Sequence, residues 1–535
     1  MFFIPMMNKV LLETIIVRGD CRGTVMEKLF YKLIFDKRIK RCLSILEILY
    51  KAPHEVDIKK LQNVLDISKR TVVTTLEFTN TLLPFYASIV FSENGVTLKN
   101  GTSQPIEVAV IEIAKNTISH RILEHAFYDG NMNVQDLANK LFISESALRV
   151  RLAHMNTVLR DFDIQLTYYD VKLKGDEANI RYFYYTYFSE FQELFNTVWD
   201  EKIDYCLDIY TNIKELTIES NTKLLNYSYP QIVRWLFVTR DRMEIGRYVE
   251  LKKPLINRIK KRESYKKFKR VYEKGIVEHL SNQEIPESEI VWAYIVRLNP
   301  IVYLNDNSGR ELYRDEANNK RLDKKINKIL KDMFDLLNID SCYRKDFFTT
   351  HKAYFINLSL LTEISSVFQR GSSAVTKHVQ LNLNNIFTVW CDYLLSMEKE
   401  EFTCISNMNT IAAQLSMITS QFVNERIRKA NKVFYTFEGE AGLAVYLEMI
   451  SKSILPSGIE GVFIFNEVIT QELVDYEKPD IIVCNYKMPE VISDCQILRM
   501  SFIPQRNEWD LLKDLLVNLD LKFYSILNNS ESEQK

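Results

Sequence analysis

The stretch "LFISESALRVRL" (residues 141–152) fits either an ordinary core helix or the second half of a helix-turn-helix unit. Ser144 can cap a helix that begins at the next residue. The apolar stripe of this predicted helix continues beyond the stretch and consists of Leu148, Leu152, Met155 and Leu159. Such a capped amphipathic helix occurs in many helical proteins, so the decision depends on the rest of the chain.

An internal repeat favours the helix-turn-helix. A shift of 76 residues aligns "LQNVLDISKRTVVTTL" (61–76) with "LANKLFISESALRVRL" (137–152), with six identical positions out of sixteen, including the turn serines. At a shift of 75 residues, "VTLK" (96–99) meets "VKLK" (171–174). Repeats of this kind usually mean that one supersecondary unit is used twice.

Both copies place basic and polar residues on the exposed face of the second helix. The start of this helix enters the major groove in helix-turn-helix proteins. The turn "ENG" (93–95) and the alternating stretch "IQLTYYDVKLKG" (164–175) predict hairpins that would act as wings on DNA phosphates. We therefore predict two winged helix-turn-helix domains that bind double-stranded DNA, the alternative being plain helical hairpins with solvated faces. The predicted DNA-binding residues are Lys69, Arg70, Thr71, Thr74, Ser146, Arg149, Arg151, His154, Lys172 and Lys174.

The composition is that of a folded multidomain protein. A chain of 535 residues is long enough for about three or four domains. Hydrophobic residues make up 47% and charged residues 26%, which is enough to bury sizeable cores. The net charge of −1 means that any basic surface must be local. Only 14 glycines and 12 prolines are present, which favours long helices.

The eight cysteines are scattered and form no CxxC pair. This argues against a zinc site or a disulfide framework and favours reduced thiols in the cytoplasm. Apolar runs stay shorter than the roughly 18–20 residues that span a bilayer, and the first residues lack a signal-peptide pattern. We expect a cytoplasmic protein without metal, cofactor or membrane partner, with Met26 as an alternative start to Met1.

The middle of the chain, residues 176–430, has a helical and aromatic-rich pattern. The polar stretch "NPIVYLNDNSG" (299–309) predicts a connector between two helical domains. Amphipathic helices are predicted over 285–298 and 405–427. A basic run over 251–270 would bind phosphates or an acidic partner, or form a solvated helix face, and we favour the solvated face.

After residue 430 the pattern changes to alternating strands and helices. Short apolar strands are predicted at 432–437, 461–466, 480–485 and 496–502, and helices at 441–455 and 508–523. Alternation of this kind indicates a small parallel sheet covered by helices.

This order of domains resembles the Mga/AtxA-type transcription regulators of Gram-positive bacteria. The resemblance implies a mainly α, multidomain fold with two winged helix-turn-helix domains, two PTS regulation domains and an enzyme IIB-like α/β domain. The corresponding boundaries in this chain are 1–105, 106–175, 176–305, 306–430 and 431–535.

The resemblance also points to histidine phosphorylation. The stretch "YRKDFFTTHKAYFINLSLLTEI" (343–364) is similar to the first histidine helix of such a domain, with His351 at the phosphorylated position. In the counterpart "YSYPQIVRWLFVTRDRMEIG" (227–246), Trp235 or Leu236 replaces the expected histidine. A neutral imidazole is nucleophilic near pH 7 and can accept a phosphoryl group. His279 and His378 are further candidates, and a structural role is the alternative for all three.

The enzyme IIB-like resemblance is incomplete at its phosphate site. True phosphocarriers of this type have a cysteine after the first strand, whereas this chain has "TFEGEAG" (436–442), with Glu438 and Glu440. Two acids would repel an anion, so we expect a dimerisation or docking domain there and a buried core thiol at Cys484.

The sequence therefore predicts a transcription regulator rather than an enzyme. We expect an activator of virulence or carbohydrate-responsive genes, controlled by PTS phosphorylation and by dimerisation. The expected partners are double-stranded DNA, a PTS phosphocarrier protein, a second copy of the chain and RNA polymerase. The alternatives are a phosphocarrier component of the phosphotransferase system and an RNA-binding antiterminator.

Overall fold

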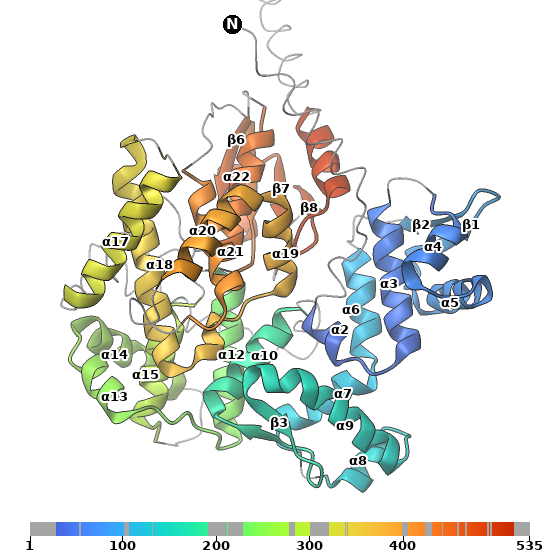
Figure 1. Ribbon diagram of the computed structural model, residues 1–535, viewed down its shortest axis with the longest axis horizontal. Coiled ribbons are helices and arrows are strands. Elements are labelled where there is room, and N and C mark those ends of the chain that lie inside the picture. Colours follow the sequence, from blue (N-terminus) through green and yellow to red (C-terminus); the bar gives the residue numbers. More distant parts are fainter. Residues whose placement is uncertain are drawn as a thin grey trace, which may run out of the picture.

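The computed structural model describes residues 28–190, 228–277, 284–299, 320–422 and 431–517, with short gaps inside these ranges. This part of the chain is mainly helical and ends in a small parallel sheet, which confirms the predicted fold class. Figure 1 shows the N-terminal helix-turn-helix regions on the opposite side of the molecule from α17 (Lys320–Leu336). None of the described helices is long and apolar enough to cross a membrane.

The two N-terminal regions have the same order of elements. The first consists of α2 (Leu29–Leu33), α3 (Lys37–Lys51), α4 (Ile58–Leu65), α5 (Lys69–Leu82), β1 (Ala87–Phe91) and β2 (Val96–Asn100). The second consists of α6 (Ile106–Lys115), α7 (Ile118–Phe127), α8 (Val134–Lys140), α9 (Glu145–Leu159), η1 (Arg160–Phe162), β3 (Ile164–Leu166) and β4 (Leu173–Gly175). In each region the two strands pair as an antiparallel hairpin, as predicted.

The turns between the paired helices are alike in detail. Asp66 and Phe142, which are 76 residues apart, both adopt left-handed backbone conformations with φ of 51° and 57°. Two residues later, the hydroxyls of Ser68 and Ser144 accept hydrogen bonds from backbone N–H groups of the second helix and cap it. The same turn therefore directs both helix pairs, which confirms the repeat as a structural one.

Helices dominate the middle of the chain, where they form a first helical region (177–296) and a second helical region (320–420). Those before the undescribed residues 300–319 are α10 (Glu177–Ser189), α12 (Tyr229–Glu244), α13 (Lys253–Lys260), α14 (Glu263–Val277) and α15 (Glu287–Val296). After α17 come η3 (Ser341–Tyr343), α18 (Arg344–Ile364), η4 (Ser366–Gln369), α19 (Ser373–Asn382), α20 (Asn384–Ser396) and α21 (Met408–Ser420). The predicted connector lies almost wholly outside the described residues.

The basic run over 251–270 forms α13 and the start of α14. Most of its cationic side chains are exposed, and several pair with acids. Lys269 Nζ lies 2.6 Å from Glu287, and Arg258 contacts Glu363 of α18 at 2.5 Å. This arrangement is that of a solvated helix face balanced by acidic residues.

The C-terminal sheet has four parallel strands, which confirms the predicted parallel sheet. The strands are β5 (Asn431–Thr436), β6 (Ile459–Phe463), β7 (Ile481–Cys484) and β8 (Gln496–Arg499), in the spatial order β6-β5-β7-β8. The helices α22 (Leu443–Ile454) and α23 (Gln471–Glu477) connect strands, and a further helix over 506–517 follows β8. The interior of the sheet is apolar and includes Cys484, which is buried as expected.

Candidate DNA interface and its link to the helical domains

Helix α5 presents the predicted cationic residues to solvent. Lys69, Arg70 and Thr74 are exposed, and Thr71 is half-buried with its hydroxyl 2.9 Å from that of Ser68. The opposite face of the helix packs into the core through Val72 and other apolar residues. The start of α5 is therefore free to enter a DNA groove.

Helix α9 exposes a smaller polar surface. Ser146 and Arg149 are exposed near its N-terminus. The Arg149 guanidinium donates to the Glu145 carboxylate at 2.9 Å and to the Tyr168 carbonyl of the hairpin at 3.1 Å. Arg149 therefore connects the helix to its wing, and Glu145 would compete with DNA for this cation.

Two other predicted residues of α9 face the N-terminal helix instead. Arg151 is half-buried, with its guanidinium 5.2 Å from the centre of the Phe35 ring. His154 Nε2 lies 3.0 Å from the Lys32 carbonyl. In this conformation both side chains hold α9 against the segment that joins α2 and α3, and their DNA contacts stay a prediction.

The second wing carries the predicted lysines and exposed aromatic residues that the prediction missed. Lys174 is exposed, and Lys172 is half-buried, with its ammonium 3.9 Å from Asp170. Tyr169 is 79% exposed, and Phe142 in the helix-turn-helix turn is 91% exposed. The pair "YY" at the centre of the hairpin sequence was the available signal, because aromatic residues at a predicted turn cannot easily be buried in the core.

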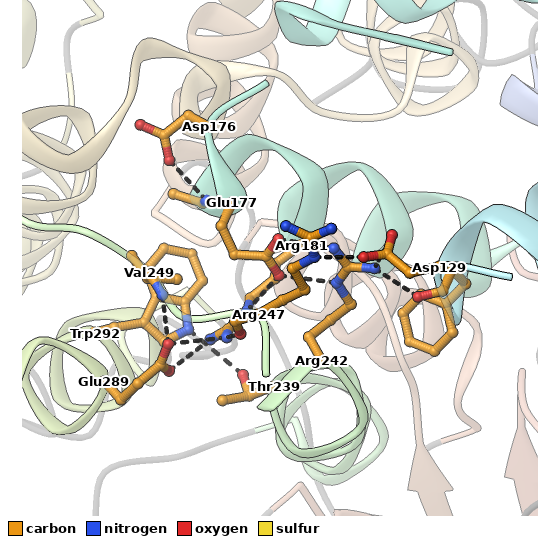
Figure 2. A network of polar contacts seen from close by, with 12 residues as sticks. Asp129, Asp176, Glu177, Arg181, Thr239, Arg242, Arg247, Val249, Glu289 and Trp292 are labelled. Atoms are coloured by element: carbon orange, nitrogen blue, oxygen red, sulfur yellow. Dashed lines mark hydrogen bonds and ion pairs between the residues drawn. The ribbon is translucent and has the colours of Figure 1, made fainter. Parts of the chain in front are cut away.

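A buried ionic network joins the second helix-turn-helix region to the first helical region (Figure 2). Arg181 of α10 is completely buried and donates to both Glu289 oxygens, at 2.7 and 2.9 Å. It also donates to Glu177 at 3.1 Å and to the Arg247 carbonyl at 2.8 Å. A fully buried guanidinium is stable only with such complete pairing.

The same network continues toward the end of α7. Arg242 of α12 donates to both Glu177 oxygens, at 2.9 and 2.8 Å, and to the Phe127 carbonyl. Arg247 pairs with Asp129, just after α7. Burial alone would raise the pKa of Glu177, but Arg242 and Arg181 lower it below its ordinary value. This network fixes α10 and α12 relative to the DNA-binding region. It is called the buried ionic network below and consists of Glu177, Arg181, Arg242 and Glu289.

His351 lies in the core of the second helical region rather than on its surface. Its side chain is completely buried in α18, and its ring stacks near Trp390 with centroids 5.8 Å apart. Nδ1 lies 2.8 Å from the Phe347 carbonyl, and Nε2 lies 2.9 Å from the Thr419 hydroxyl of α21. A carbonyl can only accept, so Nδ1 carries the proton and Nε2 accepts from Thr419. Both nitrogens are therefore engaged in this conformation.

We expect His351→Gln to change the pH dependence of stability. Burial lowers the pKa of His351 to about 3, whereas an unfolded histidine titrates near about 6.5. Between these pH values the unfolded chain binds more protons than the folded one. Acidification from pH 7 to pH 5 should therefore lower the contribution of His351 to the free energy of unfolding by about 2 kcal/mol. The stability difference between wild type and variant in urea should shrink by that amount at pH 5. Parallel curves at the two pH values would contradict this assignment.

The other two predicted phosphorylation sites differ in position. His378 of α19 is half-buried, its Nε2 lies 3.2 Å from the Tyr446 hydroxyl, and burial lowers its pKa to about 4. His279 lies outside the described residues. Phosphorylation of all three histidines stays a prediction.

The sequence of the loop after β5 contains Glu438 and Glu440 and no cysteine. Glu438 is buried and forms an ion pair with Arg234 of α12. Glu440 accepts hydrogen bonds from the Ser372 N–H and the Gln414 side chain. Burial raises the pKa of the Cys484 thiol to about 12, which disfavours the thiolate.

Comparisons with known proteins agree with this geometry. Both helix-turn-helix units expose their second helices, as DNA-binding units of this type do. Residues 105–188 match the Mga helix-turn-helix domain, which spans α6 to α10. This match and the relatives below confirm the predicted resemblance to Mga/AtxA-type regulators and support a role in transcription regulation.

The chain is similar to three named regulators. A trans-acting regulator of Streptococcus pneumoniae is 25% identical over 228 residues, which cover 42% of this chain and 45% of the relative. Capsule synthesis positive regulator AcpB of Bacillus anthracis is 20% identical over 387 residues, 71% of this chain and 78% of AcpB. Capsule synthesis positive regulator AcpA of the same organism is 24% identical over 146 residues, 27% of this chain and 30% of AcpA. The chain thus aligns with less than half of the first relative.

Proposed function

We propose that this protein is a transcription activator that binds double-stranded DNA with both helix-turn-helix units. The observation that carries the proposal is the repeated turn at Asp66 and Phe142, which presents α5 and α9 in the same way. Two units in one chain suit a long or bipartite site, where phosphate contacts supply affinity and a few base contacts supply specificity. The names of AcpA and AcpB as positive regulators favour activation over repression.

Genome-wide mapping of DNA bound by the purified protein tests this function. Bound fragments should share a sequence motif and lie upstream of genes. Duplex DNA carrying the motif should then bind more tightly than RNA of the same sequence at the same salt concentration, because salt strongly affects such affinities. Preferential RNA binding would favour an antiterminator and overturn the proposal.

We further propose control by PTS phosphorylation in the second helical region. Because Thr419 of α21 occupies Nε2 of His351, phosphorylation of His351 requires α18 and α21 to separate. A phosphate would then add about −1.5 to −2 charge to an apolar core, by analogy with phosphoserine, and hold it open. Incubation with a PTS phosphocarrier and mapping of phosphohistidine tests this step. Absence of phosphate from His279, His351 and His378 would contradict it.

We also propose that residues 431–535 mediate dimerisation. Three apolar side chains on the described part of this domain are strongly exposed: Tyr476 (82%), Leu511 (49%) and Val517 (51%). Replacing all three by serine should weaken self-association by about ten-fold or more, because each buried apolar side chain contributes about 1.5–3 kcal/mol. Sedimentation equilibrium of the full chain measures this change.

The control changes three leucines of the second helical region that are also about half exposed or more. These are Leu336 (61%), Leu381 (71%) and Leu395 (67%). Their replacement by serine should leave self-association unchanged. A larger effect from this triple variant than from the C-terminal one would move the dimer contact to the helical region.

A further inference from the structure

A cavity of about 180 Å³ lies where the N-terminal, helical and C-terminal regions meet. Its walls come from α3, α6 and α10 on one side, from α12, α18 and α21 on another, and from loops of the C-terminal sheet. An apolar cavity of about 150 Å³ is large enough to bind benzene. The space therefore admits a small organic molecule.

The sheet meets this cavity at the carboxyl ends of its strands. The chain moves from β5 to β6 on one side and then crosses to β7 on the other, so the topological switch point lies between β5 and β7. Glu438 follows β5 and Asn485 follows β7, and their hydrogen bonds at 2.6 and 2.7 Å join the two loops beside the cavity. Open α/β sheets bind ligands at this position.

Two carboxyl groups at this end of the sheet can still accept hydrogen bonds from a ligand. Glu438 is 1% exposed, and its Oε2 atom has no hydrogen-bond partner among the described residues, although its Oε1 atom pairs with Arg234. Glu440 has hydrogen bonds to Ser372 and Gln414, but within the described ranges no lysine or arginine forms an ion pair with it. Burial raises the pKa of Glu440 to about 7. A cation in the cavity would satisfy both groups.

Gly371 makes room for the Glu440 carboxylate. A Cβ atom at this position would lie 2.7 Å from Glu440 Oε2 and 2.8 Å from Oε1. Such distances are too short for any larger residue without a shift of the carboxylate. The Gly371 backbone therefore lies directly against the Glu440 carboxylate.

Several of the cationic side chains around the cavity already have acidic partners. Lys51 lies 2.7 Å from Glu47, and Arg370 lies 3.8 Å from Asp161. Arg234, which also lines the cavity, pairs with Glu438. Lys28 and Arg499 line it as well and would favour an anion. The acids next to β5 favour a cation, and the experiment below includes both charges.

Part of the cavity wall is aromatic. Tyr182 and Tyr185 of α10 and Phe368 of η4 line the cavity. The rings of Tyr182 and Phe368 have centroids 4.7 Å apart. Aromatic faces attract both apolar groups and ammonium ions.

We propose that this cavity binds a small organic amine, with its ammonium group at Glu438 and Glu440 and its apolar body against Tyr182, Tyr185 and Phe368. The site touches α3 and α6 of the DNA-binding regions as well as the helical regions. Binding of the amine should therefore change the affinity of the protein for DNA. This effector role rests on the proposed function.

Three probes with the same ring and linker test the site by calorimetry on the full chain at pH 7.5. These are 2-phenylethylamine, 2-phenylethanol and 3-phenylpropanoate. The amine should bind about ten-fold or more tightly than the other two, because a charge-assisted hydrogen bond contributes about 1.5–3 kcal/mol. No binding of the amine, or equal or tighter binding of the alcohol or the acid, would overturn the proposal without any variant.

Near-isosteric variants locate the ammonium group. Glu438→Gln and Glu440→Gln should each weaken amine binding by about ten-fold, whereas Glu472→Gln, at an exposed acid of α23, should not. A cooperative thermal transition shows that each variant is folded, even where the loss of the Arg234 pair lowers the midpoint. Full amine affinity in both cavity variants would overturn the assignment. Amine binding without a change in DNA affinity would overturn the effector role alone. Amine binding by a chain that binds no DNA would refute the proposed function and leave the site standing.

Discussion

Replacing Arg181 by methionine should destabilise the full chain by about 3–5 kcal/mol, because it leaves a buried charge without its partner. Glu289 is completely buried and would lose both guanidinium contacts, at 2.7 and 2.9 Å. Glu177 would keep only its contacts to Arg242. The measurement is the midpoint of the unfolding transition of α10, followed by hydrogen exchange, since a chain of several domains need not unfold in one step.

Two further variants separate this effect from general damage. Arg247→Met removes an arginine whose side chain is 50% exposed, from the Asp129 pair beside the same network, and should cost at most about 1 kcal/mol. The double variant Arg181→Met, Glu289→Gln should be more stable than Arg181→Met alone, because the unpaired charge is gone. Equal stability of Arg181→Met and Arg247→Met would show that the buried ionic network does not fix α10.

Replacing Arg70 and Arg149 by alanine should reduce affinity for the mapped DNA site by about 30-fold or more, at about 1–3 kcal/mol for each lost base contact. Both residues are exposed, and they lie on α5 and α9, the helices that we propose enter the groove. If one of them contacts only phosphate, the slope of log affinity against log salt concentration should instead decrease in magnitude by about one. Fluorescence anisotropy at several salt concentrations distinguishes the two kinds of contact.

A variant that should strengthen DNA binding is the most direct control for α9. Glu145 accepts from Arg149 at 2.9 Å and adds negative charge at the start of the helix. Glu145→Gln should therefore strengthen DNA binding, by about two- to five-fold for the loss of one exposed acid. Weaker binding in Glu145→Gln would place Arg149 outside the interface.

Local pattern was enough to predict the repeated helix pairs and the parallel sheet. Turn serines, apolar spacing and strand length are all short-range features, and they recur at Ser68 and Ser144. The helix caps Asp57 and Asn133 are also 76 residues apart, so a longer alignment by residue role would have extended the repeat to the first helix of each pair. These features need no knowledge of distant contacts.

The partners of charged and aromatic side chains could not be predicted in this way. Arg151 and His154 have the spacing of groove-facing residues, yet the Phe35 ring, more than 100 positions earlier in the sequence, lies against both. Arg181 and Glu289 are 108 positions apart. Periodicity describes which face a residue occupies, whereas tertiary packing decides what covers that face.

His351 shows the same limit at the regulatory site. Apolar residues on both sides of it in sequence indicate a packed helix, but not that Trp390 and Thr419 from two later helices enclose the ring. The resemblance to a regulation domain identifies the residue, and only the packing shows that α18 and α21 would have to separate before phosphate could reach it.

A nuclease footprint on the mapped DNA site, with wild type and with separate α5 and α9 variants, tests the central claim most directly. Wild type should protect two adjacent segments in successive grooves. Arg70→Ala with Lys69→Ala should lose protection of one segment only, and Arg149→Ala with Ser146→Ala should lose the other. A footprint that both variants leave intact, or that either variant abolishes completely while the other has no effect, would contradict DNA binding by two helix-turn-helix units.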